Sequence, residues 1–338
     1  MQRIQAGCDA KSTHRSGFCI GGVSVVVNGA CGEDVNLVPS LEPFRIETGP
    51  SDIVIQVEWS ASLAPTHRRK IFDSGTTWRL YQTEEGFQFD FRAPVFGEAP
   101  YKRLLADNHF SRTILQISEE SFANVSYEAE PLGYPLDELL IMHRLTQERA
   151  IELHGVGIVG PNGSGNLFVG HSGAGKSTTA RLWTSLHDVE ILSDDRIIVR
   201  EDPVREDVVR EDPVREVSAQ DDRAVLPHAQ DDKAKQGHGG MRMYGTPWHG
   251  EAHFALPQSA PLQRIFVLEH GQGNVLTRLT RSQVVGELFA RSFVPFHRHE
   301  YVDSALSFLE RVADTVPCYR YSFEPDERAV ERILGFRD

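Results

Sequence analysis

Residues 170–177 read GHSGAGKS and fit the phosphate-binding P-loop pattern G-x-x-x-x-G-K-[ST]. Glycines in this pattern let the backbone N–H groups wrap closely around phosphate oxygens. Lys176 can place its charge on the β- and γ-phosphates of a nucleotide, and the Ser177 hydroxyl can ligate Mg²⁺. The predicted nucleotide-binding residues are Gly170, His171, Ser172, Gly173, Ala174, Gly175, Lys176, Ser177 and Thr178.

The sequence on either side of this loop supplies the elements that such a site needs. The apolar run at 166–169 is typical of a buried strand, and residues 178–183 favour a helix. The N-terminus of that helix adds a favourable potential for an anion. A glycine-rich turn with an incidental lysine is the alternative, and it accounts for neither flanking element.

A second group of candidate catalytic residues lies in the strand-like run 189–199, which Asp194, Asp195 and Arg196 interrupt. One carboxylate could hold the metal and the other could accept a proton from an attacking hydroxyl. Because adjacent side chains of an extended segment point to opposite faces, we expect only one of the two to face the phosphates. The alternative is an acidic turn with no chemical role.

The remaining polar candidates are single residues. Arg298 could neutralise the γ-phosphate in the manner of an arginine finger. His249 and His253 flank Glu251, and a His-Arg-His segment occupies 297–299. Zn²⁺ in proteins usually has more ligands than such pairs provide, so solvated or hydrogen-bonded histidines are expected here.

The first part of the chain, residues 1–135, is predicted to be a β-rich domain of unknown role. Alternation of apolar and polar residues indicates strands, and clusters of turn residues separate them. Strands are predicted at 18–27, 53–59, 78–82 and 87–91, with turns at 28–29 and 84–86.

The second domain is predicted to span 136–338. A helix at 135–145 opens it, and a strand at 150–159 then reaches the P-loop strand through a turn at 161–165. This hairpin is unusual, because a helix precedes the second strand in the common parallel βαβ nucleotide-binding folds. Further strands are predicted at 262–268 and 318–323, and helices at 283–289, 301–313 and 326–334.

Residues 199–238 form a low-complexity insertion in which VREDPVRE and AQDD each recur after ten residues. Such a charged segment buries too little apolar area to offset its ordering entropy. We expect a disordered surface loop between two strands. A charged docking arm for a partner is the alternative.

Composition bounds the class of protein. A net charge of −13 argues against a nucleic-acid-binding protein, because the sequence shows no cluster of basic residues that could contact a phosphate backbone. Neither a signal-peptide-like start nor an apolar run long enough for a membrane span is evident. Four cysteines without metal-site spacing predict free thiols and a cytoplasmic protein: Cys8, Cys19, Cys31 and Cys318.

Three blocks together resemble the catalytic domain of the HPr kinase/phosphorylase family, which shares its core with ATP-dependent phosphoenolpyruvate carboxykinase. They are the His-Gly-Val that starts at His154, the P-loop, and the Asp-Asp-Arg that starts at Asp194. The resemblance covers about residues 135–335. It implies an α/β (α+β) P-loop kinase domain of this type, with His154 near the active site, Asp194 and Asp195 as metal ligand and base, and a homo-oligomer.

The chain departs from the family at two places. Thr178 replaces the usual glutamate, and GTPWHGE at 245–251 replaces an Ile-Glu-Ile-Arg-Gly block. The family's glutamate metal ligand then corresponds to Glu251. These blocks are similar to a divergent branch, some members of which phosphorylate a serine of a ribosomal peptide such as a lasso-peptide precursor.

These observations lead to one expected function with two alternatives. The first is an ATP- and Mg²⁺-dependent kinase that transfers the γ-phosphoryl group to a hydroxyl, on a serine of a peptide or protein. A small-molecule hydroxyl kinase is the second. The third is a regulatory module that senses ATP without transferring phosphate.

Overall fold

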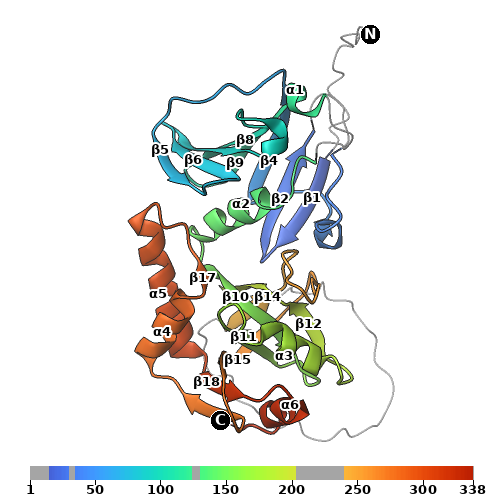
Figure 1. Ribbon diagram of the computed structural model, residues 1–338, viewed down its shortest axis with the longest axis vertical. Coiled ribbons are helices and arrows are strands. Elements are labelled where there is room, and N and C mark those ends of the chain that lie inside the picture. Colours follow the sequence, from blue (N-terminus) through green and yellow to red (C-terminus); the bar gives the residue numbers. More distant parts are fainter. Residues whose placement is uncertain (1–14, 30–34, 124–129, 203–239, 338) are drawn as a thin grey trace, which may run out of the picture.

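The computed structural model describes residues 15–29, 35–123, 130–202 and 240–337. These residues form a mixed α and β structure with two nine-stranded sheets. Figure 1 shows one sheet above the other, with helix α2 (Leu136–Leu145) between them. None of the described helices is both long and apolar enough to span a bilayer.

The first sheet has the strand order β3-β1-β2-β4-β9-β8-β7-β6-β5. It is antiparallel except for the two pairings of β4, with β2 and with β9, which are parallel. Its strands are β1 (Arg15–Ile20), β2 (Val23–Asn28), β3 (Arg45–Ile46), β4 (Ile53–Ser60), β5 (Lys70–Asp73), β6 (Trp78–Gln82), β7 (Gly86–Phe91), β8 (Lys102–Asp107) and β9 (Arg112–Ser118). The short helices η1 (Glu42–Phe44), η2 (Pro94–Phe96) and α1 (Glu119–Phe122) lie in its connections.

The predicted strands at 53–59, 78–82 and 87–91 are confirmed, and the last two form the predicted hairpin. The single strand predicted at 18–27 is wrong, because β1 and β2 are joined by a tight turn at Gly21 and Gly22. Both glycines have positive φ, 59° and 78°, a conformation that suits a two-residue hairpin turn. Asn28, the first residue of the turn predicted at 28–29, is instead the last residue of β2, and residues 30–34 lie outside the described part.

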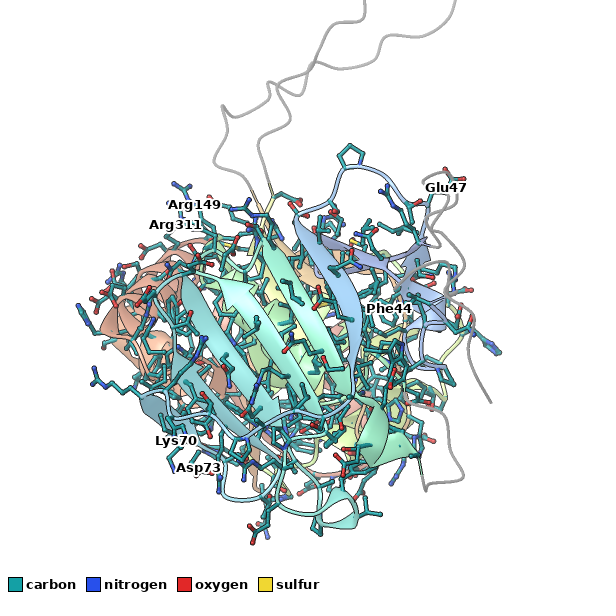
Figure 2. The ribbon with its side chains drawn as sticks, turned by 90° about the horizontal axis from the view of Figure 1, so that it is seen from above. Phe44, Glu47, Lys70, Asp73, Arg149 and Arg311 are labelled. Atoms are coloured by element: carbon teal, nitrogen blue, oxygen red, sulfur yellow. The ribbon has the colours of Figure 1, made fainter. Side chains whose placement is uncertain are left out.

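One face of the first sheet forms a hydrophobic core with α2. Phe89, Leu104 and Leu115 lie opposite one another on three adjacent strands and are fully buried. The buried leucines of α2 belong to the same core, although the sequence predicted this helix as the start of the second domain. Figure 2 looks down on the sheet from above, with Lys70 and Asp73 of β5 at one edge and Phe44 and Glu47 towards the other.

The second sheet contains a ring of five strands. β10 and β11 form a hairpin, β10 also pairs with β13, β13 with β14, β14 with β15, and β15 returns to β11 in parallel. Its strands are β10 (Ala150–Val159), β11 (Gly165–Val169), β12 (Glu190–Ser193), β13 (Arg196–Glu201), β14 (Met241–Tyr244), β15 (Ser259–His270), β16 (Val275–Arg278), β17 (Ser292–Phe293) and β18 (Cys318–Phe323).

Helices cover both faces of this sheet, so its central strands are apolar on both sides. In β11, Leu167 and Val169 face the core under α4 (Arg281–Phe289) and α5 (His299–Thr315), whereas Phe168 faces the core under α3 (Lys176–Trp183) and α6 (Glu327–Leu334). The predicted hairpin, strands and helices of the second half are all confirmed.

Strand β14 was missed, because four residues are too few for a clear alternation signal. It pairs with β13, and both flank the low-complexity insertion, of which residues 203–239 lie outside the described part. Residues 199–201, predicted as part of that insertion, belong to β13. Cys19 and Cys318 are free thiols as predicted, and Cys8 and Cys31 lie outside the described residues.

His143 of α2 lies in an aromatic cluster that joins the first sheet to the start of α5. Its ring is 1% exposed and packs against Phe89, Phe110 and His297, with centroids 5.2, 4.8 and 5.2 Å away. Its Nδ1 lies 2.6 Å from the Leu139 carbonyl oxygen. Burial lowers the pKa of His143 to about 3 and that of His297 to about 4.

Stability should therefore fall as the pH drops from about 6.5 to about 3. In this window the unfolded chain binds protons on these histidines and the folded chain does not, so each ring contributes a slope of up to about 1.4 kcal/mol per pH unit. Denaturant unfolding at several pH values measures this slope. His143→Phe should reduce the slope of the free energy of unfolding against pH, and His299→Phe, at an exposed histidine, should not. An unchanged slope in His143→Phe would refute the assignment.

Candidate active site

The P-loop connects the end of β11 to the start of α3, as the sequence predicted. Two of its glycines are required by geometry. Gly173 and Gly175 have φ of 80° and 98°, in the left-handed region that favours glycine. A Cβ on Gly175 would also lie 2.5 Å from Cζ of Phe323. The observed conformation of the loop therefore requires glycine at both positions.

Lys176 is the first residue of α3 and is buried. Its Nζ donates to the carbonyl oxygens of Gly170 and His171, both at 3.1 Å. Burial lowers the pKa of Lys176, and the negative charge of Asp195 opposes this effect. The amine is thus held inside the loop and senses the charge of Asp195.

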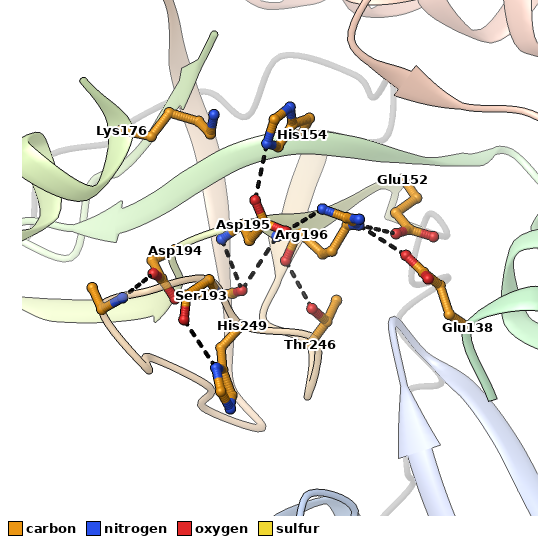
Figure 3. Close-up of polar contacts among 12 residues, drawn as sticks. Glu138, Glu152, His154, Lys176, Ser193, Asp194, Asp195, Arg196, Thr246 and His249 are labelled. Atoms are coloured by element: carbon orange, nitrogen blue, oxygen red, sulfur yellow. Dashed lines mark hydrogen bonds and ion pairs between the residues drawn. The ribbon is translucent and has the colours of Figure 1, made fainter. Parts of the chain in front are cut away.

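His154 and Asp195 form a hydrogen-bonded pair beside the P-loop (Figure 3). His154 lies on β10, and its Nε2 is 2.9 Å from Oδ1 of Asp195. The Gly155 N–H donates to the Asp195 carbonyl at 3.0 Å, which fixes the two strands next to each other. The side chains are 24% and 27% exposed, so both are positioned yet accessible to a ligand. Figure 3 shows the Lys176 amine directed towards this pair.

The surroundings of Asp195 favour its ionised form. Burial raises the pKa of this carboxyl, but the hydrogen bond from His154 and the charge of Arg196 lower it by more. Lys176 adds a smaller contribution in the same direction. The net pKa lies below the ordinary value, so Asp195 is a carboxylate at neutral pH and can accept a hydrogen bond or a proton.

Asp194 and Asp195 lie in a bend between β12 and β13, not on an extended strand as predicted, and their side chains have different partners. Its carboxylate is buried and accepts hydrogen bonds from three backbone N–H groups, those of Gly250, Ala252 and Phe254, at 3.0, 2.8 and 3.2 Å. A Cβ on Gly250 would lie 2.9 Å from Oδ2 of Asp194. Asp194 therefore holds the 249–254 loop against the site, a role that the sequence did not indicate.

Arg196 is the centre of a charged cluster that sequence reasoning missed. Its NH1 donates to Oδ2 of Asp195, and its Nε donates to Oε1 of Glu138 at 2.8 Å. Oε1 of Glu152 lies 3.4 Å from the same Nε, and the guanidinium stacks 4.0 Å from the ring centroid of Phe293. The sequence signalled this cluster only through the Asp-Asp-Arg block, because Glu138 and Glu152 lie on other elements, α2 and β10.

Glu152 of β10 is 1% exposed, and neither of its side-chain oxygens has a hydrogen-bond partner. Burial and the neighbouring charge of Glu138 raise its pKa well above the ordinary value. Two glutamates share one guanidinium in a dry environment, and both cannot be ionised at low cost. The raised pKa of Glu152 favours its protonated form.

Arg291 is a second cation that the sequence did not single out. Its backbone carbonyl accepts the His154 N–H at 2.8 Å, and its buried guanidinium contributes to lowering the pKa of Lys176. Arg298 has a different environment. Its guanidinium lies 4.5 Å from the ring centroid of Phe87 and donates to Asn108 at 3.3 Å. These contacts place Arg298 against the first sheet, and none of its contacts within the described residues is with the P-loop.

Glu251 is exposed in the loop that Asp194 holds. The rings of His249 and His253 meet edge to face there, with centroids 4.7 Å apart. In the part of the chain that the structure describes, no three His, Cys, Asp or Glu side chains converge as a metal site. Mg²⁺ does not need such a cage, because it is usually bound by one or two carboxylates together with substrate phosphates and water. A set of ligands made of the Ser177 hydroxyl and one carboxylate is therefore of the kind that Mg²⁺ uses.

No protein-family model matches this sequence, and no curated protein is similar enough to it to count as a relative. The arguments for function below therefore depend on the geometry of the site. The structure brings together a phosphate-binding loop, an ionised carboxylate and a histidine that orients it. Together they can hold a phosphorylated ligand and accept a proton from a hydroxyl placed beside it.

Proposed function

We propose that the protein is an ATP- and Mg²⁺-dependent kinase that transfers the γ-phosphoryl group to a hydroxyl, on a serine of a peptide or protein. The observation that carries this proposal is the His154–Asp195 pair, at 2.9 Å, within the electrostatic range of the P-loop lysine. A loop that only bound nucleotide would not need an oriented, accessible carboxylate at this position.

In the proposed reaction, the Asp195 carboxylate accepts the proton of the acceptor hydroxyl. The acceptor oxygen forms a bond to the γ-phosphorus, the bond from that phosphorus to the β,γ-bridging oxygen breaks, and ADP leaves. His154 keeps Oδ1 of Asp195 in place. Lys176, released from the loop carbonyls, stabilises the charge on the transferred group.

A bound Mg²⁺ would neutralise charge on the β- and γ-phosphates. Ser177 would hold it, because the Asp194 oxygens already accept three backbone N–H groups and Asp195 serves as the base. Glu251, on the loop that Asp194 orders, is the carboxylate ligand that the resemblance provides. Asp194 then acts by shaping this side of the site.

The topology supports the family resemblance for the second half of the chain. A hairpin of β10 and β11 feeds the P-loop, and Asp195 lies in the bend immediately before β13, the strand that pairs with β10. We therefore propose a kinase domain of the HPr kinase and phosphoenolpyruvate carboxykinase type, with a cytoplasmic location that fits the use of ATP. A homo-oligomer remains part of this proposal.

Transfer of label from [γ-³²P]ATP in the presence of Mg²⁺ tests the proposed function. A library of serine-containing peptides should become labelled, and the same peptides with serine replaced by alanine should not. Labelling of a hydroxylated small molecule alone would favour the small-molecule kinase. Tight ATP binding with no transfer to any acceptor would contradict kinase activity and favour the ATP-sensing module.

A further inference from the structure

Glu138 is the one residue of the charged cluster that comes from α2, the helix that packs under the first sheet. Its Oε1 accepts a hydrogen bond from Nε of Arg196 at 2.8 Å. The two side chains are only 10% and 15% exposed. Little solvent competes for this ion pair, so it constrains the guanidinium much more than a surface pair would.

Two groups fix the position of the Arg196 guanidinium. Glu138 holds Nε, and the Phe293 ring lies 4.0 Å away on its face. NH1 remains for Oδ2 of Asp195. Because a guanidinium is planar and rigid, fixing its Nε edge and its face also fixes the direction of NH1.

The carboxylate of Asp195 is therefore held at both oxygens. His154 contacts Oδ1 and Arg196 contacts Oδ2. Glu152 cannot replace Glu138 in this geometry. It lies 3.4 Å from Nε on β10, and an ionised Glu152 would draw the guanidinium towards that strand. Without Glu138, Arg196 would shift and Asp195 would lose one of its two restraints.

We propose that Glu138 is a positioning residue for phosphoryl transfer, which holds Asp195 in place through Arg196 and makes α2 of the first sheet's core a part of the active site. This inference rests on the proposed kinase function. A displacement of about 1 Å at a reacting group can cost about 10²-fold in rate, so the contribution is measurable. It also gives the β-rich half of the chain a role in the chemistry.

Glu138→Ala should lower kcat about 10- to 100-fold and leave the KM for ATP within about 2-fold, because the P-loop itself is untouched. Glu148→Ala is the matched control. Glu148 is similarly buried and pairs with Arg200 on the same strand, β13, but it makes no contact with Asp195 within the described residues. It should retain nearly the kcat of the wild type.

Two conservative variants separate position from charge. Glu138→Gln keeps the length of the side chain and an oxygen that can accept from Nε of Arg196. Glu138→Asp keeps the charge but withdraws the carboxylate by one methylene. The glutamine variant should therefore be faster than the aspartate variant. The opposite order would overturn the positioning role, and it can be measured even if Glu138→Ala does not fold.

The ¹⁵N chemical shift of His154 Nε2, assigned with His154→Asn, gives a readout that does not depend on turnover. It reports the hydrogen bond to Asp195 and should change in Glu138→Asp but not in Glu148→Ala. If the wild type transfers no phosphate, the kinase proposal fails. The chemical shift still tests whether Glu138 positions Asp195 through Arg196. An unchanged shift, or an unchanged kcat in Glu138→Ala, would overturn the inference.

Discussion

Lys176→Ala is expected to abolish phosphoryl transfer, with a fall in rate of about 10³-fold, because a charge that stabilises the transition state in a buried site cannot be replaced by water. The ammonium is held inside the loop by two carbonyl contacts of 3.1 Å, and in the proposed reaction it leaves them to contact the transferred group. Label transfer from [γ-³²P]ATP in single-turnover experiments measures the effect.

Lys176→Met keeps the length and packing of the side chain without its charge, so it should lose as much activity as Lys176→Ala. Lys70→Ala is the control, because Lys70 is exposed at an edge of the first sheet and pairs with Asp73 there. Its activity should equal that of the wild type. Transfer at more than about a tenth of the wild-type rate in both Lys176 variants would contradict the proposed mechanism.

Asp195→Asn is expected to retain nucleotide binding and lose turnover. The asparagine has nearly the same shape but cannot accept a proton, and loss of a general base lowers rates by about 10²- to 10⁴-fold. Isothermal titration with ATP should give a Kd close to that of the wild type, because the P-loop residues that contact phosphate are unchanged. Single-turnover label transfer measures the loss.

Asp194→Asn is the matched change at the neighbouring carboxylate, and the two variants should differ in kind. Asp194 accepts three backbone N–H groups, so an amide in its place leaves part of the 249–254 loop without an acceptor. This variant should lower the melting temperature, whereas the main effect of Asp195→Asn should be on turnover. A stable, fully active Asp195→Asn protein would exclude Asp195 as the base.

Short-range patterns predicted the parts of the site that a few consecutive residues build. The P-loop needs glycines at fixed spacing, because its backbone adopts φ values of 80° and 98° at Gly173 and Gly175. The hairpin that feeds it follows from two apolar runs and a turn between them. Since these features depend on local conformation, the sequence carries them directly.

The sequence also predicted Asp194 and Asp195 on an extended segment with opposite orientations, but it could not tell which one faces the phosphates. That choice depends on what packs against each side. The 249–254 loop, far along the chain, covers Asp194, and His154 of β10 contacts Asp195. Both are long-range contacts, for which neither spacing nor residue type is a signal.

The sequence by itself therefore determined a loop of the P-loop pattern, its flanking hairpin and helix, and a pair of carboxylates nearby. Only the tertiary structure decided that Asp195 is the accessible one, that Glu152 is buried without hydrogen-bond partners, and that Glu138 reaches Arg196 from 58 residues earlier in the chain. The physical reason is that ion pairs and burial depend on which surfaces meet in the fold, and a local pattern carries no record of these surfaces.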